Sequence, residues 1–176
     1  MHGTLETPRI RSLTEADADT FRALRLRALR DHPEAFGASY EEEVDQPIER
    51  TVERLRASSS GSFVLGAFLG DALVGSVGLN RPARPKTQHR GTIWGMYVCP
   101  EASGRGIGRA LLHEAIACAR AITGLEELTL GVTVGNERAR RLYLAAGFVP
   151  YAIEPRLFKI DDRYYDLERM RLPLIA

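Results

Sequence analysis

Runs of apolar residues alternate along the chain with stretches whose apolar residues recur at helical spacing, and this pattern predicts strands and helices in mixed order. The apolar runs predict strands at about residues 9–13, 63–69, 72–79, 92–98, 128–134, 148–154 and 164–172. The amphipathic stretches predict four helices, at about residues 14–30, 48–57, 107–122 and 136–146. Prolines and a glycine within residues 31–47 predict an irregular loop there. We therefore expect an α/β fold (α+β mixed sheet) of about seven strands, in one domain that covers residues 1–176.

Composition narrows the class of protein. The 176 residues include 44% apolar and 27% charged side chains, as in an ordinary globular domain. A net charge of +1 argues against a protein whose overall charge attracts it to nucleic acids or membranes. No apolar run approaches the roughly 18 residues of a spanning helix, and the polar first residues are unlike a signal peptide. We expect a cytoplasmic protein with no nucleic-acid or membrane partner.

The segment that carries candidate chemistry runs from Trp94 to Ala115, where a strand leads through a glycine-rich loop into a helix. Glycines at 104, 106 and 108 allow a ligand to approach the backbone closely. The first turn of the following helix offers unpaired N–H groups and a positive dipole end. This combination predicts a site for an anionic ligand such as phosphate. The spacing excludes a P-loop, because no Gly-Lys-Ser/Thr follows, and Arg109 stands where a dinucleotide fingerprint needs glycine.

The loop Ser103-Gly104-Arg105-Gly106-Ile107-Gly108 resembles the acyl-CoA pyrophosphate loop of GNAT-superfamily N-acetyltransferases, with Ser103 where that pattern has Gln or Arg. Downstream, Asn136-x-x-Ala139-x-x-x-Tyr143-x-x-x-Gly147-Phe148 is similar to the second GNAT motif, in the family's order and separation. The resemblance implies a GNAT-like fold with a central splayed strand pair. It also implies transfer of an acetyl group from acetyl-CoA directly to a primary amine of a small molecule or peptide, in a ternary complex.

The resemblance also assigns residues to the binding of acetyl-CoA, with no metal. The loop would hold the pyrophosphate, and the pantetheine arm would add to the splayed strand. A backbone N–H of that strand, from Tyr97 or Val98, would stabilise the charge that develops on the thioester oxygen. The helix predicted at residues 136–146 would contribute Asn136, Arg140 and Tyr143, a stripe of side chains spaced i, i+4 and i+7 that one ligand could touch. The candidate cofactor-binding residues are Met96, Tyr97, Val98, Ser103, Gly104, Arg105, Gly106, Ile107, Gly108, Arg109, Asn136, Arg140 and Tyr143.

Candidate catalytic residues follow from the needs of the reaction. Tyr143 is the candidate acid for the leaving thiolate, because a phenol with a pKa near 10 stays protonated at neutral pH. The alternative is a tyrosine whose ring only packs under the last strands, and Asn136 could equally be a helix cap. The strand 92–98 contains no carboxylate to serve as base, so Glu34, Glu41 or Tyr40 is sought from the acceptor region. Glu41 also belongs to an acidic run that is typical of a solvated surface.

Several alternatives remain open. The main one is a non-catalytic acyl-CoA sensor or interaction module, which Ser103 and the missing strand carboxylate favour. A covalent acyl-cysteine route through Cys99 would need a nearby base and a low thiol pKa. The acidic run 41–43 faintly favours a cationic acceptor. A homodimer could form through the last strands if Tyr164 and Tyr165 are exposed.

Overall fold

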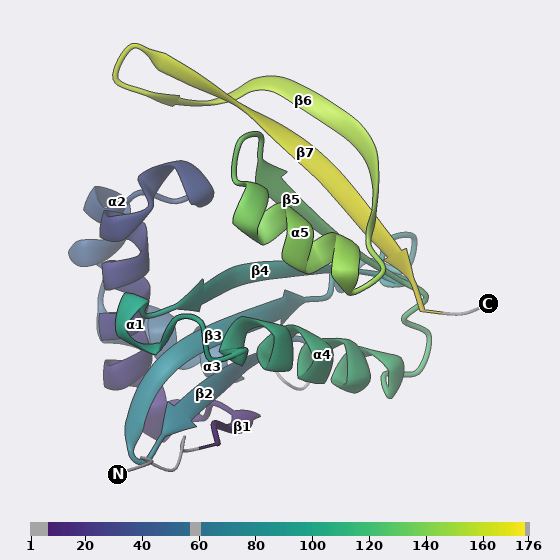
Figure 1. The fold of residues 1–176 in the computed structure, drawn as a ribbon. Helices are drawn as coiled ribbons and strands as arrows, with labels where there is room; N and C mark the ends of the chain where they lie inside the picture. Colours follow the sequence, from purple (N-terminus) through teal and green to yellow (C-terminus); the bar gives the residue numbers. More distant parts are fainter. Residues whose placement is uncertain (1–6, 57–60, 175–176) are drawn as a thin grey trace, which may run out of the picture.

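The fold is a single seven-stranded sheet with helices on both faces, seen in a computed structural model that describes residues 7–56 and 61–174 (Figure 1). The strands are β1 (Arg9–Ser12), β2 (Phe63–Leu69), β3 (Ala72–Asn80), β4 (Arg90–Val98), β5 (Glu127–Thr133), β6 (Val149–Ile160) and β7 (Arg163–Pro173). The helices are α1 (Ala18–Asp31), α2 (Tyr40–Val44), α3 (Ile48–Arg56), α4 (Ile107–Arg120) and α5 (Glu137–Ala145). The mixed α/β architecture and the seven strands are confirmed.

The sheet has the order β1-β2-β3-β4-β5-β7-β6, and its neighbours are antiparallel except for β4 and β5. The parallel pair is held only at one end, where residues 90–92 pair with residues 127–129. Beyond Thr92 the two strands separate, which confirms the expected splayed pair. β5 is paired along its whole length on its other edge, with β7, so the gap between β4 and β5 opens within the sheet.

A bulge in β4 accompanies the separation. Tyr97 lies opposite Ser76 and Trp94 lies opposite Gly78, so Gly95 and Met96 together face one residue of β3. Gly95 has a φ of 62°, a value that glycine adopts without a steric penalty. Gly95 therefore forms part of the bulge, and the bulge turns the end of β4 away from β5.

Two apolar cores lie on the two faces of the sheet. Figure 1 shows α4 and α5 in front of the sheet, with α1 and its neighbours behind and to the left. Leu111, Leu112 and Ala115 of α4 are fully buried in the larger core, against residues of β2 to β5. Phe21 and Leu24 of α1 are buried in the second core, together with Tyr97 and Cys99. Side chains from the end of β4 therefore alternate between the two cores.

The expected helix count of four is wrong, because α2 forms within the segment that we expected to be an irregular loop. Ser39 accepts a hydrogen bond from the Glu42 backbone N–H at 3.2 Å, and the Glu42 carboxylate accepts one from the Ser39 N–H at 2.7 Å. This reciprocal capping satisfies the first turn of a short helix between two proline-containing segments. The Ser-x-x-Glu signature is present in the sequence, but Pro33, Gly37 and Pro47 around it led to the prediction of a loop.

The last two strands form a longer hairpin than expected, joined at Asp161 and Asp162. Tyr164 is exposed, whereas Tyr165 is half-buried. The homodimer therefore stays a prediction that rests on Tyr164 and on the exposed side chains Val149, Tyr151 and Ile153 of β6. The expected end of the helix predicted at residues 48–57 lies outside the described residues.

Because Leu111 has no exposed surface in the larger core, Leu111→Ala should lower the free energy of unfolding by roughly 2–5 kcal/mol. Leu144→Ala, at a position that is 38% exposed on α5, should change it by less than about 0.5 kcal/mol. Urea denaturation of both variants measures the difference. Equal losses would mean that α4 does not pack on the sheet as described.

Candidate active site

A cavity of about 880 Å³ occupies the gap between β4 and β5. Its walls come from the segment after α1, the end of β4, the glycine loop with the start of α4, the end of β5, the first turns of α5, and β7. The lining residues are His32, Glu34, Ala35, Phe36, Met96, Tyr97, Val98, Ala102, Ser103, Gly104, Gly106, Ile107, Gly108, Arg109, Thr133, Val134, Gly135, Asn136, Arg138, Ala139, Arg141, Leu142 and Tyr165. Both sequence motifs thus contribute to one cavity.

The glycine loop brings backbone N–H groups to the cavity wall. Gly104 and Gly106 have φ values of 79° and 74°, and Gly106 is the N-cap of α4. The first helical hydrogen bond runs from the Ala110 N–H to the Gly106 carbonyl at 3.0 Å, so the amides of residues 107–109 have no acceptor within the helix. With the positive end of the dipole of this 14-residue helix, they form a surface suited to an anion.

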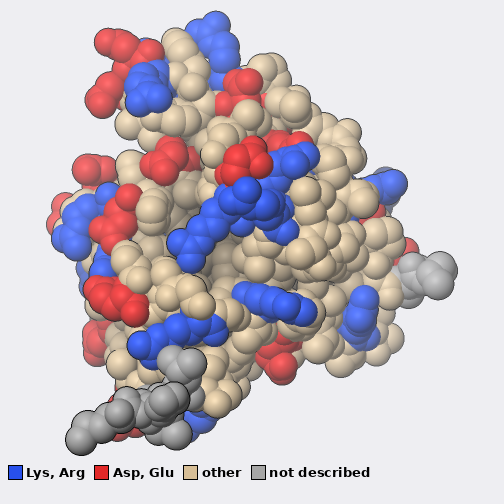
Figure 2. Space-filling view, viewed as in Figure 1, with Lys and Arg blue, Asp and Glu red and all other residues tan. Residues whose placement is uncertain are grey.

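Three arginines surround the cavity, and two of them were missed in the sequence. Arg109 of α4 lines it as expected, and Arg138 and Arg141 of α5 line it as well. Figure 2 shows Lys and Arg side chains gathered over α5 and along the hollow beneath it. The available signal was the i, i+3 spacing of Arg138 and Arg141 next to Asn136. Arg105 is exposed and does not line this cavity.

The amide of Val98 faces the gap between the strands. The Cys99 N–H donates to the Val74 carbonyl at 2.8 Å, and the next pairs along β3 and β4 are Gly75 with Val98 and Ser76 with Tyr97. Since hydrogen-bonded and non-hydrogen-bonded pairs alternate in an antiparallel ladder, the Val98 N–H points away from β3, toward β5. No residue of β5 pairs with β4 at this level. Of the two amides considered in the sequence, the alternation favours Val98, because Tyr97 belongs to a hydrogen-bonded pair with β3.

Tyr143 projects from α5 into the larger core and is not among the residues that line the cavity. The side chain is 7% exposed, and its ring packs against Phe148 with a centroid separation of 6.0 Å. Its hydroxyl makes no hydrogen bond with a described residue. Among these residues, every side-chain oxygen or nitrogen that solvent cannot reach has a hydrogen-bond partner. The hydroxyl is therefore reached by solvent. Burial raises the pKa of Tyr143 to about 12, which keeps the phenol protonated at neutral pH.

The expected stripe of Asn136, Arg140 and Tyr143 does not form a single contact surface. Asn136 caps α5 by accepting the Ala139 N–H at 3.2 Å, and it also lines the cavity. Arg140 turns to β7, where its Nε lies 2.8 Å from the Glu168 carboxylate. The helix instead turns residues 138, 139, 141 and 142 toward the cavity. The helical spacing was right, but the face that borders the cavity is rotated by about one residue.

The segment after α1 closes the cavity and brings two titratable side chains to it. Thr133 anchors this segment by donating its hydroxyl to the Glu34 carbonyl at 2.6 Å. The His32 Nδ1 lies 3.9 Å from the Glu34 carboxylate, and both side chains line the cavity. Glu41, the other carboxylate considered, is exposed on α2 and does not line it. Of the candidate bases, Glu34 is the one that the fold brings to the gap, with His32 beside it.

Cys99 lies directly after β4 and is buried. Burial raises the pKa of its thiol, so the nucleophilic thiolate is disfavoured at neutral pH. The acyl-cysteine route thus lacks the activated thiol that it needs.

Two further observations concern the described residues only. No group of three or more His, Cys, Asp or Glu side chains among them comes together in a way that could hold a metal ion. None of their helices is both long and apolar enough to cross a membrane.

Known proteins share both this sequence pattern and this fold. The model of the Acetyltransferase (GNAT) family matches residues 17–148, a span that contains the glycine loop, the splayed strands and α5. The chain belongs to the GNAT acetyltransferase family. Mycothiol acetyltransferase from Beutenbergia cavernae is 35% identical over 147 residues, which are 80% of this chain and 44% of that protein. This GNAT chain thus spans less than half the length of that relative.

Solved structures agree with the GNAT assignment. A GNAT-family acetyltransferase from Streptococcus pneumoniae has a TM-score of 0.86 at 26% identity, over 95% of this chain and 99% of that one. The Salmonella typhimurium protein yncA, solved with its cofactor acetyl-CoA, has a TM-score of 0.84 at 23% identity, over 97% and 95% of the two chains. The second likeness is one of fold.

The environment of Tyr143 predicts a specific pH dependence. The folded GNAT domain keeps this phenol protonated up to about pH 12, whereas an unfolded tyrosine ionises near pH 10. The folded state thus binds more protons between these values, and stability falls as the pH rises through them. Tyr143→Phe should lose less stability than the wild type between about pH 10 and 12, measured by denaturation at each pH. Identical profiles would place the hydroxyl in an environment like that of a surface tyrosine.

Proposed function

We propose that this GNAT domain is an N-acetyltransferase that moves an acetyl group from acetyl-CoA to a primary amine of a small molecule or peptide. The observation that carries the proposal is the cavity that joins the N-terminus of α4 to the gap beside the Val98 amide. An anion site and a free strand amide are the two features that a phosphorylated thioester requires. Direct attack by the amine in a ternary complex completes the proposal, because the buried Cys99 thiol does not favour a covalent intermediate.

The donor would lie along the floor of the cavity. Its pyrophosphate would accept hydrogen bonds from the amides of residues 107–109, with Arg109, Arg138 and Arg141 neutralising its charge. Its pantetheine amides would pair with the edge of β4 at Met96 and Val98, in the place of a strand partner. This arrangement brings the thioester to the Val98 N–H.

The chemistry then needs an oxyanion donor, an acid and a base. The amine lone pair attacks the thioester carbon, and the Val98 N–H stabilises the oxygen that becomes negative, a contribution of about 3 kcal/mol. The carbon–sulfur bond breaks, and Tyr143 gives its proton to the departing thiolate. Glu34, with His32 beside it, takes the proton that the nitrogen loses, and exchange with solvent returns a proton to the phenol. The products are an amide and a free thiol.

A non-catalytic acyl-CoA sensor is the second candidate, favoured by Ser103 in the loop and by the lack of a carboxylate on β4. A panel of amines with release of the CoA thiol as readout separates the two candidates. Thiol release that depends on an amine supports the enzyme, whereas binding of acetyl-CoA with no release from any amine supports the sensor.

If Tyr143 acts as the acid, Tyr143→Phe should lower kcat by about tenfold or more and leave the affinity for acetyl-CoA nearly unchanged. The ring and its packing on Phe148 are retained, so the loss reports the hydroxyl. Tyr151→Phe, at a position that is 49% exposed on β6, is the matched control and should keep full activity. Unchanged turnover in Tyr143→Phe would remove this residue from the mechanism.

If the glycine loop binds the pyrophosphate, Gly106→Asp and Gly108→Asp should abolish binding of acetyl-CoA by placing a carboxylate against it. Gly124→Asp is the control for backbone strain, because Gly124 has a φ of 77°, close to the 74° of Gly106, beyond the other end of α4. Calorimetric titration should show wild-type affinity for the control. Normal affinity in both loop variants would contradict the assignment.

A further inference from the structure

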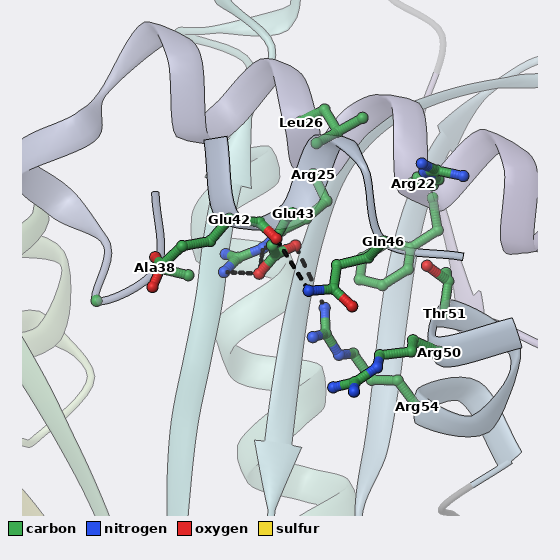
Figure 3. Close-up of a pocket in the computed structure, with 12 residues that line it drawn as sticks. Arg22, Arg25, Leu26, Ala38, Glu42, Glu43, Gln46, Arg50, Thr51 and Arg54 are labelled. Atoms are coloured by element: carbon green, nitrogen blue, oxygen red, sulfur yellow. Dashed lines mark hydrogen bonds and ion pairs between the residues drawn. The ribbon is translucent and has the colours of Figure 1, made fainter. Parts of the chain in front are cut away.

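Two adjoining cavities lie behind the donor cavity, on the face of the sheet that α1 and α3 cover. One, of about 360 Å³, lies between α1, α2 and α3, and the other, of about 600 Å³, extends from it along β2, β3 and β4. Both are lined by Arg25, Ala38, Glu43 and Arg54. Figure 3 shows side chains from the three helices converging in the first of them.

Positive charge exceeds negative charge in these cavities. Four arginines line them (Arg22, Arg25, Arg50 and Arg54). They face two carboxylates, Glu42 and Glu43, and Glu42 is already engaged in capping α2. Glu43 is shared, since it accepts hydrogen bonds from Arg25 at 3.0 Å and lies 3.7 Å from Arg54. Arg22 donates to the Val44 carbonyl at 2.8 Å, and the remaining three arginines still outnumber the one carboxylate that two of them share.

Arg50 is exposed and supplies donors that no protein group in the described part of the chain uses. Its side chain makes no hydrogen bond or ion pair with any residue in the described part of the chain, and it stands one turn from Arg54 on the same face of α3. In Figure 3 both side chains extend from α3 into the cavity, Arg54 toward Glu43. Guanidinium groups in this arrangement suit the planar oxygens of a carboxylate or the oxygens of a phosphate.

Two of the arginines contact aromatic rings that lie close to the transfer site. Arg25 lies over the Phe36 ring at 5.2 Å and over the Trp94 ring at 5.9 Å, and Arg54 lies over Trp94 at 5.4 Å. Phe36 lines the donor cavity, and Trp94 belongs to β4, four residues before Val98. Gly78 leaves room for the Trp94 ring, since a Cβ there would lie 2.2 Å from it. A molecule bound among the arginines would lie on the face of β4 opposite α4, against the strand that carries the Val98 amide.

Resting on the transfer reaction proposed above, we propose that the acceptor amine carries an anionic group, a carboxylate or a phosphate, and that Arg25, Arg50 and Arg54 bind it. This reverses the faint expectation of a cationic acceptor from the acidic run 41–43. Glu43 is paired with arginines, Glu42 is engaged at the cap of α2, and Glu41 lines none of the three cavities described here. A second ammonium group in this region would meet arginines.

Kinetics with matched acceptors test the proposal. Glycine, β-alanine and longer ω-amino acids would be compared with their carboxamides, and phosphoethanolamine with ethanolamine, by release of the CoA thiol. We expect kcat/KM at least about tenfold higher for the anionic member of the preferred pair, and the preferred pair identifies carboxylate or phosphate. Arg50→Gln and Arg54→Gln should remove that preference by raising KM for the anionic member alone. Arg120→Gln, on the exposed last turn of α4, is the charge-matched control.

A second readout does not depend on turnover. Trp94 is the single tryptophan of the chain, so its fluorescence reports on occupancy of this site. N-acetylated ω-amino acids and N-acetylphosphoethanolamine should change the emission saturably, and the corresponding neutral amides and alcohol should not. The change should weaken by about tenfold in apparent affinity in Arg50→Gln, whose side chain has no partner to lose and whose fold should be unaffected.

The two readouts separate failure of this proposal from failure of the transfer reaction. Absence of thiol release from every amine, with a saturable and Arg50-dependent fluorescence change, would overturn the reaction and keep the anion site. Thiol release with equal kcat/KM for anionic and neutral acceptors, or anion preference unchanged in Arg50→Gln and Arg54→Gln, would overturn the anion site.

Discussion

The incomplete pairing of β4 with β5 is the constraint on which the rest of the site depends. The two strands are held together only at residues 90–92 and 127–129, and the bulge at Gly95 turns the end of β4 away. A sheet normally satisfies its backbone groups with neighbouring strands, so an opening inside it leaves amides without protein partners. The fold tolerates this because β5 is paired along its other edge with β7, and because helices pack on both faces. The unpaired amides are what a ligand with its own amide groups can use.

Charge is organised on both sides of this opening. On the α4 and α5 side, Arg109, Arg138 and Arg141 and the helix N-terminus favour the phosphates of a donor. On the α1 and α3 side, a second group of arginines shares Glu43 and lies close to Trp94. The chain carries a net charge of only +1, so the net charge alone does not reveal these local groups of arginines. Under this account the donor and the acceptor approach β4 from opposite faces, and their anionic groups stay apart.

Local sequence signals were sufficient for most of the architecture. The hydrophobic pattern predicted the strands and four of the five helices. Apolar runs and amphipathic spacing can each be recognised within one segment of sequence, without knowledge of the rest of the fold. The glycine loop and Asn136 were predicted as parts of one site, and both line the cavity. α2 was missed, because a capping signature over a few residues is weak beside the prolines that surround it.

Side-chain direction was harder to predict than secondary structure. Arg140 was expected at the ligand but pairs with Glu168, a residue 28 positions later whose position depends on the β7 register. Arg138 and Arg141 line the cavity because α5 is rotated by its packing on the sheet, which helical spacing alone does not define. The arginines around Glu43 and Glu43 itself come from α1, α2 and α3. No motif within any one of these helices indicates that the three helices pack together. Long-range packing decides these contacts.

The central claim is that the opening beside Val98 and the N-terminus of α4 together bind a phosphorylated thioester. Calorimetric titration of the purified protein with acetyl-CoA, with acetylated pantetheine lacking the nucleotide and phosphates as the comparison ligand, tests it most directly. The account predicts micromolar affinity for acetyl-CoA and an affinity at least about a hundredfold weaker once the phosphates are removed, since several charge-assisted hydrogen bonds are lost. Absence of acetyl-CoA binding up to millimolar concentration, or equal affinity for the two ligands, would contradict it.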